Sequence, residues 1–176
     1  MLKTENERKF LVDLKAFNDW KKPTSIYDPP GGDDGVLEET LVQQGYLSLV
    51  PPVVRIRRAK EQRSGLSSHT MTVKLGGLQV RKEFEMGVTG ADSAVLLTLC
   101  RFTVTKTRWL VQWNDARWEV DVFEKWFKGL CVAELENQKM PGKKKLPPWL
   151  GKEVTKDKRY ANVMLAQFGI PDDARR

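Results

Sequence analysis

The stretch Thr4–Val12 (TENERKFLV) decides how the rest of the chain is interpreted. In an extended strand, successive side chains point to opposite faces. Glu5, Glu7 and Lys9 therefore share one face of this strand, and Phe10 lies on the other. The apolar face predicts burial against a core, so the fold depends on where the charged face is directed.

The same period of two recurs along most of the sequence, with turn-forming residues between the runs. It predicts eight strands, at Thr4–Val12, Thr40–Leu49, Val53–Lys60, His69–Leu75, Arg81–Val88, Phe102–Trp113, Arg117–Glu124 and Cys131–Gln138. Asn114-Asp115 and Gly76-Gly77 are typical of tight turns between neighbouring strands. Strands joined in this way run antiparallel.

Three helices are expected, at Leu14–Lys21, Asp92–Cys100 and Lys158–Phe168. Few of the strands are separated by long helices, which disfavours a doubly wound parallel sheet and favours an α+β fold. The stretches Pro23–Gly35 and Lys139–Lys145 are interpreted as loops. A chain of 176 residues with 40% hydrophobic content predicts one domain over residues 1–176.

The composition narrows the function classes. A net charge of +7 and a pI near 9.4 favour an anionic partner. No apolar run is long enough to span a membrane and the first residues are charged, so we expect a cytoplasmic protein without a membrane partner. Cys100 and Cys131 have apolar neighbours and are expected to be buried thiols. A single histidine, His69, disfavours Cys/His zinc sites and histidine triads.

Charged side chains gather on one face of nearly every predicted strand. Eight acids and eight bases share it, and they are Glu5, Glu7, Glu83, Glu85, Glu119, Asp121, Glu134, Glu136, Lys9, Arg55, Arg57, Lys74, Arg81, Lys106, Arg108 and Arg117. An open sheet with one solvated face would also carry mixed charge. Same-sign pairs at i and i+2, however, repel one another unless something of opposite charge binds between them. That argument favours an enclosed face.

Closing eight antiparallel strands into a barrel, flanked by helices and ending in a C-terminal helix, directs this face into a tunnel. Buried charges without partners cost several kcal/mol each. Some of these groups would pair with one another, and the rest need a ligand that carries both signs. A polyphosphate with Mg²⁺ or Mn²⁺ supplies both, since Arg and Lys bind phosphate oxygens and carboxylates bind hard cations.

The residues of these strands resemble the CYTH domain, or triphosphate tunnel metalloenzyme superfamily, and its short bacterial inorganic triphosphatase members. The first strand fits the E-x-E-x-K signature of that superfamily. The similarity continues in order through Gln44–Leu47, Arg55–Arg57, Thr72–Lys74, Arg81–Glu85, Lys106–Arg108, Trp118–Phe123, Ala133–Glu136 and Trp149–Thr155, followed by Asp157, Arg159, Tyr160 and Asn162. It thus covers nearly the whole chain.

The resemblance implies roles for individual residues. The metal ligands would be Glu5, Glu7, Asp121, Glu134 and Glu136. Glu83 and Glu85 would orient the metal or its bound water. The phosphate-binding residues would be Lys9, Arg55, Arg57, Lys74, Arg81, Lys106 and Arg108, with Arg159 closing the tunnel from the C-terminal helix. Glu5, Glu7, Lys9, Glu83 and Glu85 form the expected catalytic set. Arg117 and Glu119 match no motif of the superfamily.

The expected activity is metal-dependent hydrolysis of inorganic triphosphate to pyrophosphate and phosphate. A class IV adenylate cyclase would use the same tunnel, and a nucleoside or thiamine triphosphate is an alternative substrate. A non-enzymatic alternative is a module that binds RNA or polyphosphate through basic residues and tryptophans. Because Trp109 and Trp118 fall on apolar faces and Trp20 lies in a predicted helix, nucleic acid is disfavoured as a partner. The oligomeric state stays open, with a homodimer as one alternative.

Overall fold

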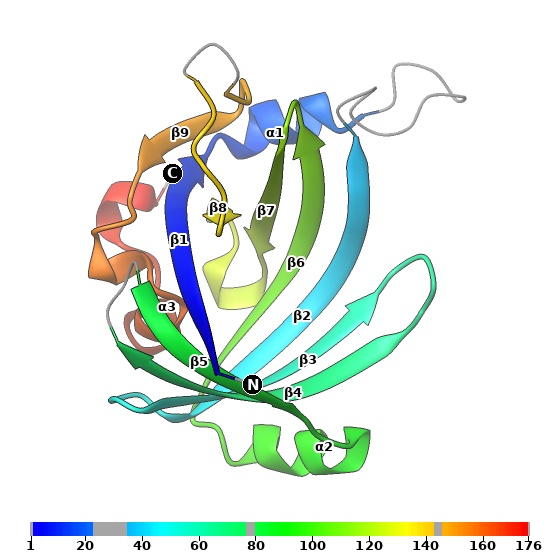
Figure 1. Ribbon diagram of the computed structural model, residues 1–176, viewed down its shortest axis with the longest axis vertical. Coiled ribbons are helices and arrows are strands. Elements are labelled where there is room, and N and C mark those ends of the chain that lie inside the picture. The colour runs from blue at the N-terminus through cyan, green and yellow to red at the C-terminus, as the bar shows by residue number, and fades with distance from the viewer. Residues whose placement is uncertain (1, 23–34, 77–79, 143–145, 176) are drawn as a thin grey trace.

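The computed structural model describes residues 2–22, 35–76, 80–142 and 146–175, and its centre is a curved antiparallel sheet (Figure 1). The strand order is β5-β4-β3-β2-β6-β7-β8-β1-β9. The strands are β1 (Leu2–Val12), β2 (Val36–Ser48), β3 (Val53–Glu61), β4 (Ser67–Gly76), β5 (Val80–Gly87), β6 (Phe102–Trp113), β7 (Ala116–Phe123), β8 (Cys131–Glu136) and β9 (Leu150–Glu153).

The helical elements lie around this sheet (Figure 1). They are α1 (Leu14–Trp20), α2 (Gly90–Thr98), α3 (Asn162–Phe168) and the short 3-10 turns η1 (Lys125–Phe127), η3 (Lys158–Tyr160) and η4 (Asp172–Ala174). The side chain of Asp13 caps α1 by accepting from Ala16 N at 3.0 Å, and that of Thr89 caps α2. Within the described part of the chain, no helix is long and apolar enough to cross a membrane.

β1 connects the two sides of the sheet. Its residues Leu2–Asn6 pair with β5, and its residues Glu7–Leu11 pair with β8. No residue of β1 pairs with both strands, so the ladder changes partner between Asn6 and Glu7 and is not continuous around the tunnel. The predicted closed barrel of eight strands is therefore correct in its antiparallel pairing and tunnel-like curvature, but not in its strand number or full closure.

The additional strand is β9, which pairs with β1 near Phe10 and Val12. It was missed because it has only four residues and no clear alternation of polar and apolar side chains. Gly151 permits the close approach of the two strands, since a Cβ at this position would lie 2.9 Å from the Leu11 carbonyl oxygen. Part of the segment Trp149–Thr155, which resembles the superfamily, is thus a strand.

Other boundaries also differ from the prediction. β2 begins at Val36 rather than Thr40. The expected helix Lys158–Phe168 is divided into η3 and α3, because Ala161 between them has an extended backbone (φ −67°, ψ 135°). The turn at Asn114-Asp115 is confirmed. The predicted loop Pro23–Gly35 lies outside the described residues except for Gly35, as do Gly77 of the Gly76-Gly77 turn and residues 143–145 of the basic loop.

The outer face of β1 and β6–β8 packs against α1 and against Trp149, which lies just before β9. The buried residues of this cluster include Phe10, Phe17, Val111, Trp118, Val120, Cys131, Ala133, Leu135 and Trp149. Trp149 contacts the rings of Phe17 and Trp118, with centroid separations of 5.4 and 6.2 Å. The expected core packing of Trp118, and of the partly buried Trp20 and Trp109, is confirmed. Both cysteines are free and buried.

A second apolar cluster lies on the inner face, at one end of the tunnel. Val104, Phe123 and Val132 belong to it. Each lies two residues from a charged residue of β6, β7 or β8 and therefore shares the inner face with it. Tyr160 and Leu165 of the C-terminal segment, both fully buried, pack against these residues. The inner face therefore changes from charged to apolar along each strand, and the C-terminal segment covers the apolar end.

The two tryptophans Trp149 and Trp126 provide a matched test of this packing, because their side chains are 0% and 92% exposed. Trp149→Ala is expected to lower the free energy of unfolding by about 3–5 kcal/mol, because it removes a large buried ring and leaves a cavity. Trp126→Ala is expected to change it by less than about 0.5 kcal/mol. Urea denaturation followed by circular dichroism measures both, and equal effects would contradict the assigned packing.

Candidate active site

Carboxylates from three neighbouring strands line one wall of the tunnel, which we call the acidic wall. It comprises Glu7 of β1, Glu119 and Asp121 of β7, and Glu134 and Glu136 of β8. Glu7 is the direct cross-strand partner of Glu136, and Glu119 is the partner of Glu134. Like charges placed opposite one another destabilise a sheet. The wall therefore requires cations close to it.

Lys9 supplies one of these cations. Its ammonium lies 2.8 Å from the Glu7 carboxylate and 3.0 Å from that of Glu134, and all three residues are buried. Burial alone would lower the pKa of Lys9, but Glu134 and Glu7 raise it above its ordinary value. Lys9 is therefore charged at neutral pH and holds β1 to β8 on the inner face.

Arg108 of β6 supplies a second cation and reaches three carboxylates. It donates to both oxygens of Asp121 at 2.7 and 2.8 Å and to Glu134 at 2.9 Å, and it also contacts Glu119. Burial opposes ionisation of Asp121 and Glu134, but the adjacent cations hold the pKa of each carboxyl below its usual value. Lys106 also contacts Asp121, and burial together with Arg108 lowers the pKa of Lys106 to about 8.

The facing wall, formed by β3–β5, is richer in cations, and we call it the basic wall. Arg55 donates to Thr72 at 3.0 Å, and Thr72 in turn donates to Glu85 at 3.1 Å. The Arg55 Nε atom is buried and has no hydrogen-bond partner among the described atoms. Lys74 forms an ion pair with Glu83. This wall therefore keeps donors that its own carboxylates do not satisfy.

Arg57 is the clearest of these donors. Among the described residues it has no hydrogen bond or ion pair, although it is largely buried and close to Arg55 and Arg108. Burial, followed by the repulsion of Arg108 and Arg55, lowers the pKa of Arg57 to about 10. The carboxylates of Glu119 and Asp121 offset this repulsion only in part, and a largely buried cation close to two other cations is unfavourable unless an anion binds to it. This arrangement therefore points to an anionic ligand.

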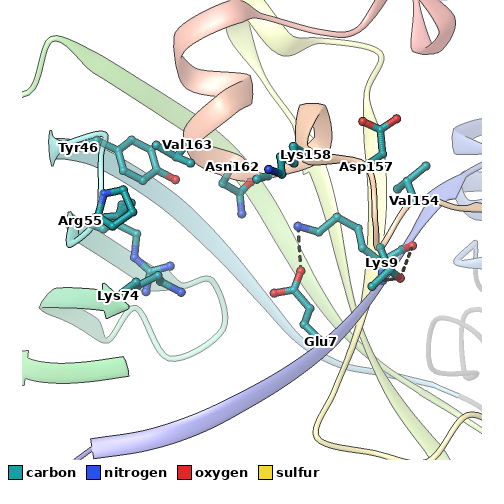
Figure 2. Close-up of a pocket in the computed structure, with 14 residues that line it drawn as sticks. Glu7, Lys9, Tyr46, Arg55, Lys74, Val154, Asp157, Lys158, Asn162 and Val163 are labelled. Atoms are coloured by element: carbon teal, nitrogen blue, oxygen red, sulfur yellow. Dashed lines mark hydrogen bonds and ion pairs between the residues drawn. The ribbon is translucent and has the colours of Figure 1, made fainter. Parts of the chain in front are cut away.

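Two cavities border these walls. The first, of about 290 Å³, is lined by Glu7, Lys9, Tyr46, Arg55, Lys74 and residues of the C-terminal segment, including Asp157, Lys158 and Asn162 (Figure 2). The second, of about 550 Å³, is lined by Glu38, Thr40, Arg57, Arg108, Glu119 and the connection between β3 and β4. Arg55 and Arg57, two residues apart on β3, place the two cavities along one tunnel.

Most of the site residues expected from the sequence come together here. Lys9, Arg55, Arg57, Lys74, Lys106, Arg108, Glu7, Glu83, Glu85, Asp121, Glu134 and Glu136 all lie on the inner face of the sheet. Glu5 and Arg81 are cross-strand partners in β1 and β5, but their side chains lie outside the described part of the structure. Arg117 is exposed at the end of β7.

Arg159 is placed differently. Its side chain is 54% exposed and pairs with Asp157 and Asp173, and it does not line either described cavity. Its neighbour Lys158 lines the first cavity instead, together with Asn162. The sequence prediction also missed Tyr46 as a lining residue. The available signal was the spacing of two between Gln44 and Tyr46 on β2, which places both on one face. The Gln44 side-chain amide donates to the Tyr46 hydroxyl at 2.9 Å.

The acidic wall is suited by its chemistry to a divalent metal ion, since carboxylate oxygens are the preferred ligands of hard cations. Within the residues whose side chains are described, no group of three carboxylates, histidines or cysteines is positioned to hold an ion. The reason is visible in the contacts, because Asp121 and Glu134 are directed to Arg108, Lys106 and Lys9. The donor types fit a metal ion, and the carboxylates are here neutralised by cationic side chains.

The fold and these walls define a tunnel protein in which an acidic wall faces a basic wall. No family model matches the chain. The chain is 30% identical over 172 residues to an inorganic triphosphatase of Nitrosomonas europaea, covering 96% of this chain and 99% of that protein. It is 31% identical over 165 residues to an inorganic triphosphatase of Acetivibrio thermocellus, covering 93% of each.

Solved structures with a similar fold support the same relationship. The crystal structure of an inorganic triphosphatase, 29% identical, matches with a TM-score of 0.56 over 92% of this chain and 93% of that one. A protein of Pyrococcus horikoshii, 19% identical, matches with a TM-score of 0.53 over 97% of this chain and 93% of its own, and shows the fold alone. The chain belongs to the inorganic triphosphatase family, and its resemblance to the triphosphate tunnel superfamily is confirmed.

Glu134 and Glu136 of the same strand should respond oppositely to neutralisation. Burial, followed by Glu119 and Glu134, raises the pKa of Glu136, whereas Lys9 and Arg108 lower that of Glu134. At pH values above the ordinary glutamate pKa, a carboxyl whose pKa is raised in the folded protein destabilises the fold. A carboxyl whose pKa is lowered in the folded protein stabilises the fold in that pH range. At pH 7 in chelator, Glu136→Gln should raise the melting temperature and Glu134→Gln should lower it.

The two differences have distinct pH dependences. The gain in Glu136→Gln should disappear as the pH falls below the ordinary glutamate pKa, because the wild-type carboxyl is then protonated in both the folded and the unfolded protein. The loss in Glu134→Gln should shrink only as the pH falls through the lowered folded-state pKa of Glu134. Thermal denaturation from pH 3 to pH 8 measures both, and shifts of the same sign at pH 7 would contradict the charge assignment.

Proposed function

We propose that the protein hydrolyses inorganic triphosphate to pyrophosphate and phosphate within the tunnel, with the help of Mg²⁺ or Mn²⁺. The relatives that cover nearly all of the chain are named inorganic triphosphatases. The structural observation that carries the proposal is Arg57, a largely buried guanidinium that has no hydrogen bond or ion pair among the described residues and has two further arginines close to it. A linear polyanion provides the missing negative charge.

The basic wall would bind the phosphate chain. Guanidinium groups bind phosphate oxygens with two parallel hydrogen bonds, and ammonium groups act as point charges. Arg55 and Arg57 project from one strand at a spacing of two, so they can contact successive phosphates. The complete proposed set is Lys9, Arg55, Arg57, Lys74, Arg81, Lys106 and Arg108. Arg159, which pairs with aspartates outside both described cavities, is left out of this set.

The acidic wall would hold the metal ion. Glu5, Glu7, Asp121, Glu134 and Glu136 are the proposed ligands, and Glu83 and Glu85 would orient the metal or a water molecule from the facing strand. A divalent ion at such a site supplies charge neutralisation on phosphate oxygens and a lower pKa for a bound water. The carboxylates now paired with Lys9 and Arg108 would be shared with it, which leaves these two cations able to contact phosphate.

The reaction requires no nucleophilic side chain. The described lining of the two cavities contains no cysteine or histidine, and direct attack by water on a phosphorus atom is the simplest route. Charge develops on the departing pyrophosphate oxygens as the bond breaks. Arginines and lysines fixed by strand pairing can stabilise this charge without reorganising, and such preorganised donors commonly contribute the largest part of a rate enhancement.

A direct assay tests this function. Purified protein given tripolyphosphate with Mg²⁺ or Mn²⁺ should release phosphate, and addition of EDTA should abolish the release. ATP and thiamine triphosphate, assayed in parallel, report the tolerance for organic groups. Absence of turnover with either ion would contradict the proposal, and formation of cyclic AMP from ATP would indicate an adenylate cyclase instead.

Arg57 and Arg58 offer a matched pair of variants, because they are adjacent on β3 and point to opposite faces. Arg57 lines the tunnel, whereas Arg58 is exposed on the outer face. Arg57→Ala should lower kcat/KM for tripolyphosphate by about 100-fold or more, the usual effect of removing a donor to developing charge. Arg58→Ala should change it by less than about twofold. Similar losses in both variants would show that β3 does not direct Arg57 to the substrate.

A further inference from the structure

The C-terminal segment contributes a large part of the first cavity. Val154, Thr155, Asp157, Lys158, Ala161, Asn162 and Val163 line it, facing residues of β1, β3 and β4. In the view of Figure 2, Lys158 and Asn162 lie between the Arg55–Lys74 side of the cavity and the Lys9–Glu7 side. A ligand that fills this cavity therefore meets the C-terminal segment as well as the two charged walls.

Several contacts fix this segment in place. Val154 N donates to the Lys9 carbonyl at 2.8 Å, and Lys9 N donates to the Thr155 hydroxyl at 3.0 Å. The ammonium of Lys9 also donates to the carbonyl of Tyr160 at 3.4 Å, and the Tyr160 ring is buried in the inner apolar cluster. The backbone on both sides of Lys158 is thus attached to β1, so its side chain extends from a fixed position.

Lys158 and Arg159, two adjacent cations of the segment, differ in whether a carboxylate already neutralises them. Arg159 is neutralised by Asp157 and Asp173. Lys158 lines the cavity and forms no ion pair with any carboxylate of the described residues, and Asp157, the acid next to it, is held by Arg159. Lys158 therefore adds an uncompensated positive charge to a cavity that already contains Lys9, Arg55 and Lys74.

Free triphosphate and its esters differ in charge at one end. A terminal phosphate loses its second proton with a pKa of about 6 and so carries close to two charges at neutral pH. Free triphosphate has two such ends, whereas in a nucleoside triphosphate one end is esterified and carries only one charge. A cation beside that end binds the free form more strongly than the ester.

We propose that Lys158 is a specificity-determining residue, which favours free triphosphate over triphosphate esters. Its ammonium binds the phosphate at the end of the chain where an ester carries its organic group. This inference rests on the triphosphatase function proposed above. It concerns only the choice among triphosphates, and the two charged walls perform the cleavage whichever triphosphate is bound.

The test compares Lys158→Met, which keeps the length of the side chain and removes its charge, with Lys156→Met as a control. Both lysines are exposed and belong to the same segment, but Lys156 does not line the cavity. With tripolyphosphate, Lys158→Met should lower kcat/KM about tenfold or more, as expected for a lost charge-assisted contact. With ATP the loss should be about threefold or less. Lys158→Arg should restore the preference, and Lys156→Met should leave both values unchanged.

Equal losses on both substrates would overturn the proposal, because Lys158 would then contact a phosphate common to both. No loss on either would overturn it as well. Calorimetric titration of tripolyphosphate and ATP into metal-free protein gives a readout that does not require turnover, and Lys158→Met should weaken only the former. If the wild-type protein does not hydrolyse tripolyphosphate, the proposed function fails, and the titration still decides the role of Lys158.

Discussion

The contact of Arg108 with Asp121, Glu134 and Glu119 is the interaction on which the arrangement of the tunnel depends. A single guanidinium from β6 neutralises carboxylates on β7 and β8, and Lys9 does the same between β1 and β8. Charged groups removed from water are tolerated only when opposite charges and hydrogen bonds surround them. These strands must therefore keep their register, since a shift by one residue would turn the charges into the outer core.

The charged side chains of the tunnel neutralise one another only in part, and the sign of the remaining charge differs between the two walls. Among the described residues, Lys9, Lys106 and Arg108 lie against the five carboxylates of the acidic wall, which keeps an excess of acids over bases. On the basic wall, Arg57 and the Arg55 Nε atom lack partners among the described residues. Excess negative charge on one side and excess positive charge on the other match a divalent cation bound to a phosphate chain. Neither a cation nor an anion alone would satisfy both walls.

The sequence predicts which charged residues share the inner face because period-two alternation is independent of how the strands are assembled. Arg55 and Arg57 are assigned to one face of their strand from spacing alone, and the structure places both on the tunnel side, where each lines a cavity. The alternation contains no information on how far the tunnel closes, which is limited because β1 pairs with β5 up to Asn6 and with β8 from Glu7. It also fails at β9, where four residues are too few to show a period, and where pairing depends on the absence of a side chain at Gly151.

Arg159 was expected to close the tunnel, but Lys158 lines the first cavity in its place. The difference shows where sequence patterns cannot predict the direction of a side chain. Regular strands assign every second residue to the tunnel, but an isolated 3-10 turn followed by extended Ala161 obeys no simple period. Burial of Tyr160 and Leu165 fixes how this segment packs, and that packing sets which basic residue faces the cavity. Because the buried residues anchor the segment while Lys158 lines the cavity, the inferred role of Lys158 can be tested by substitution without disturbing the charged walls.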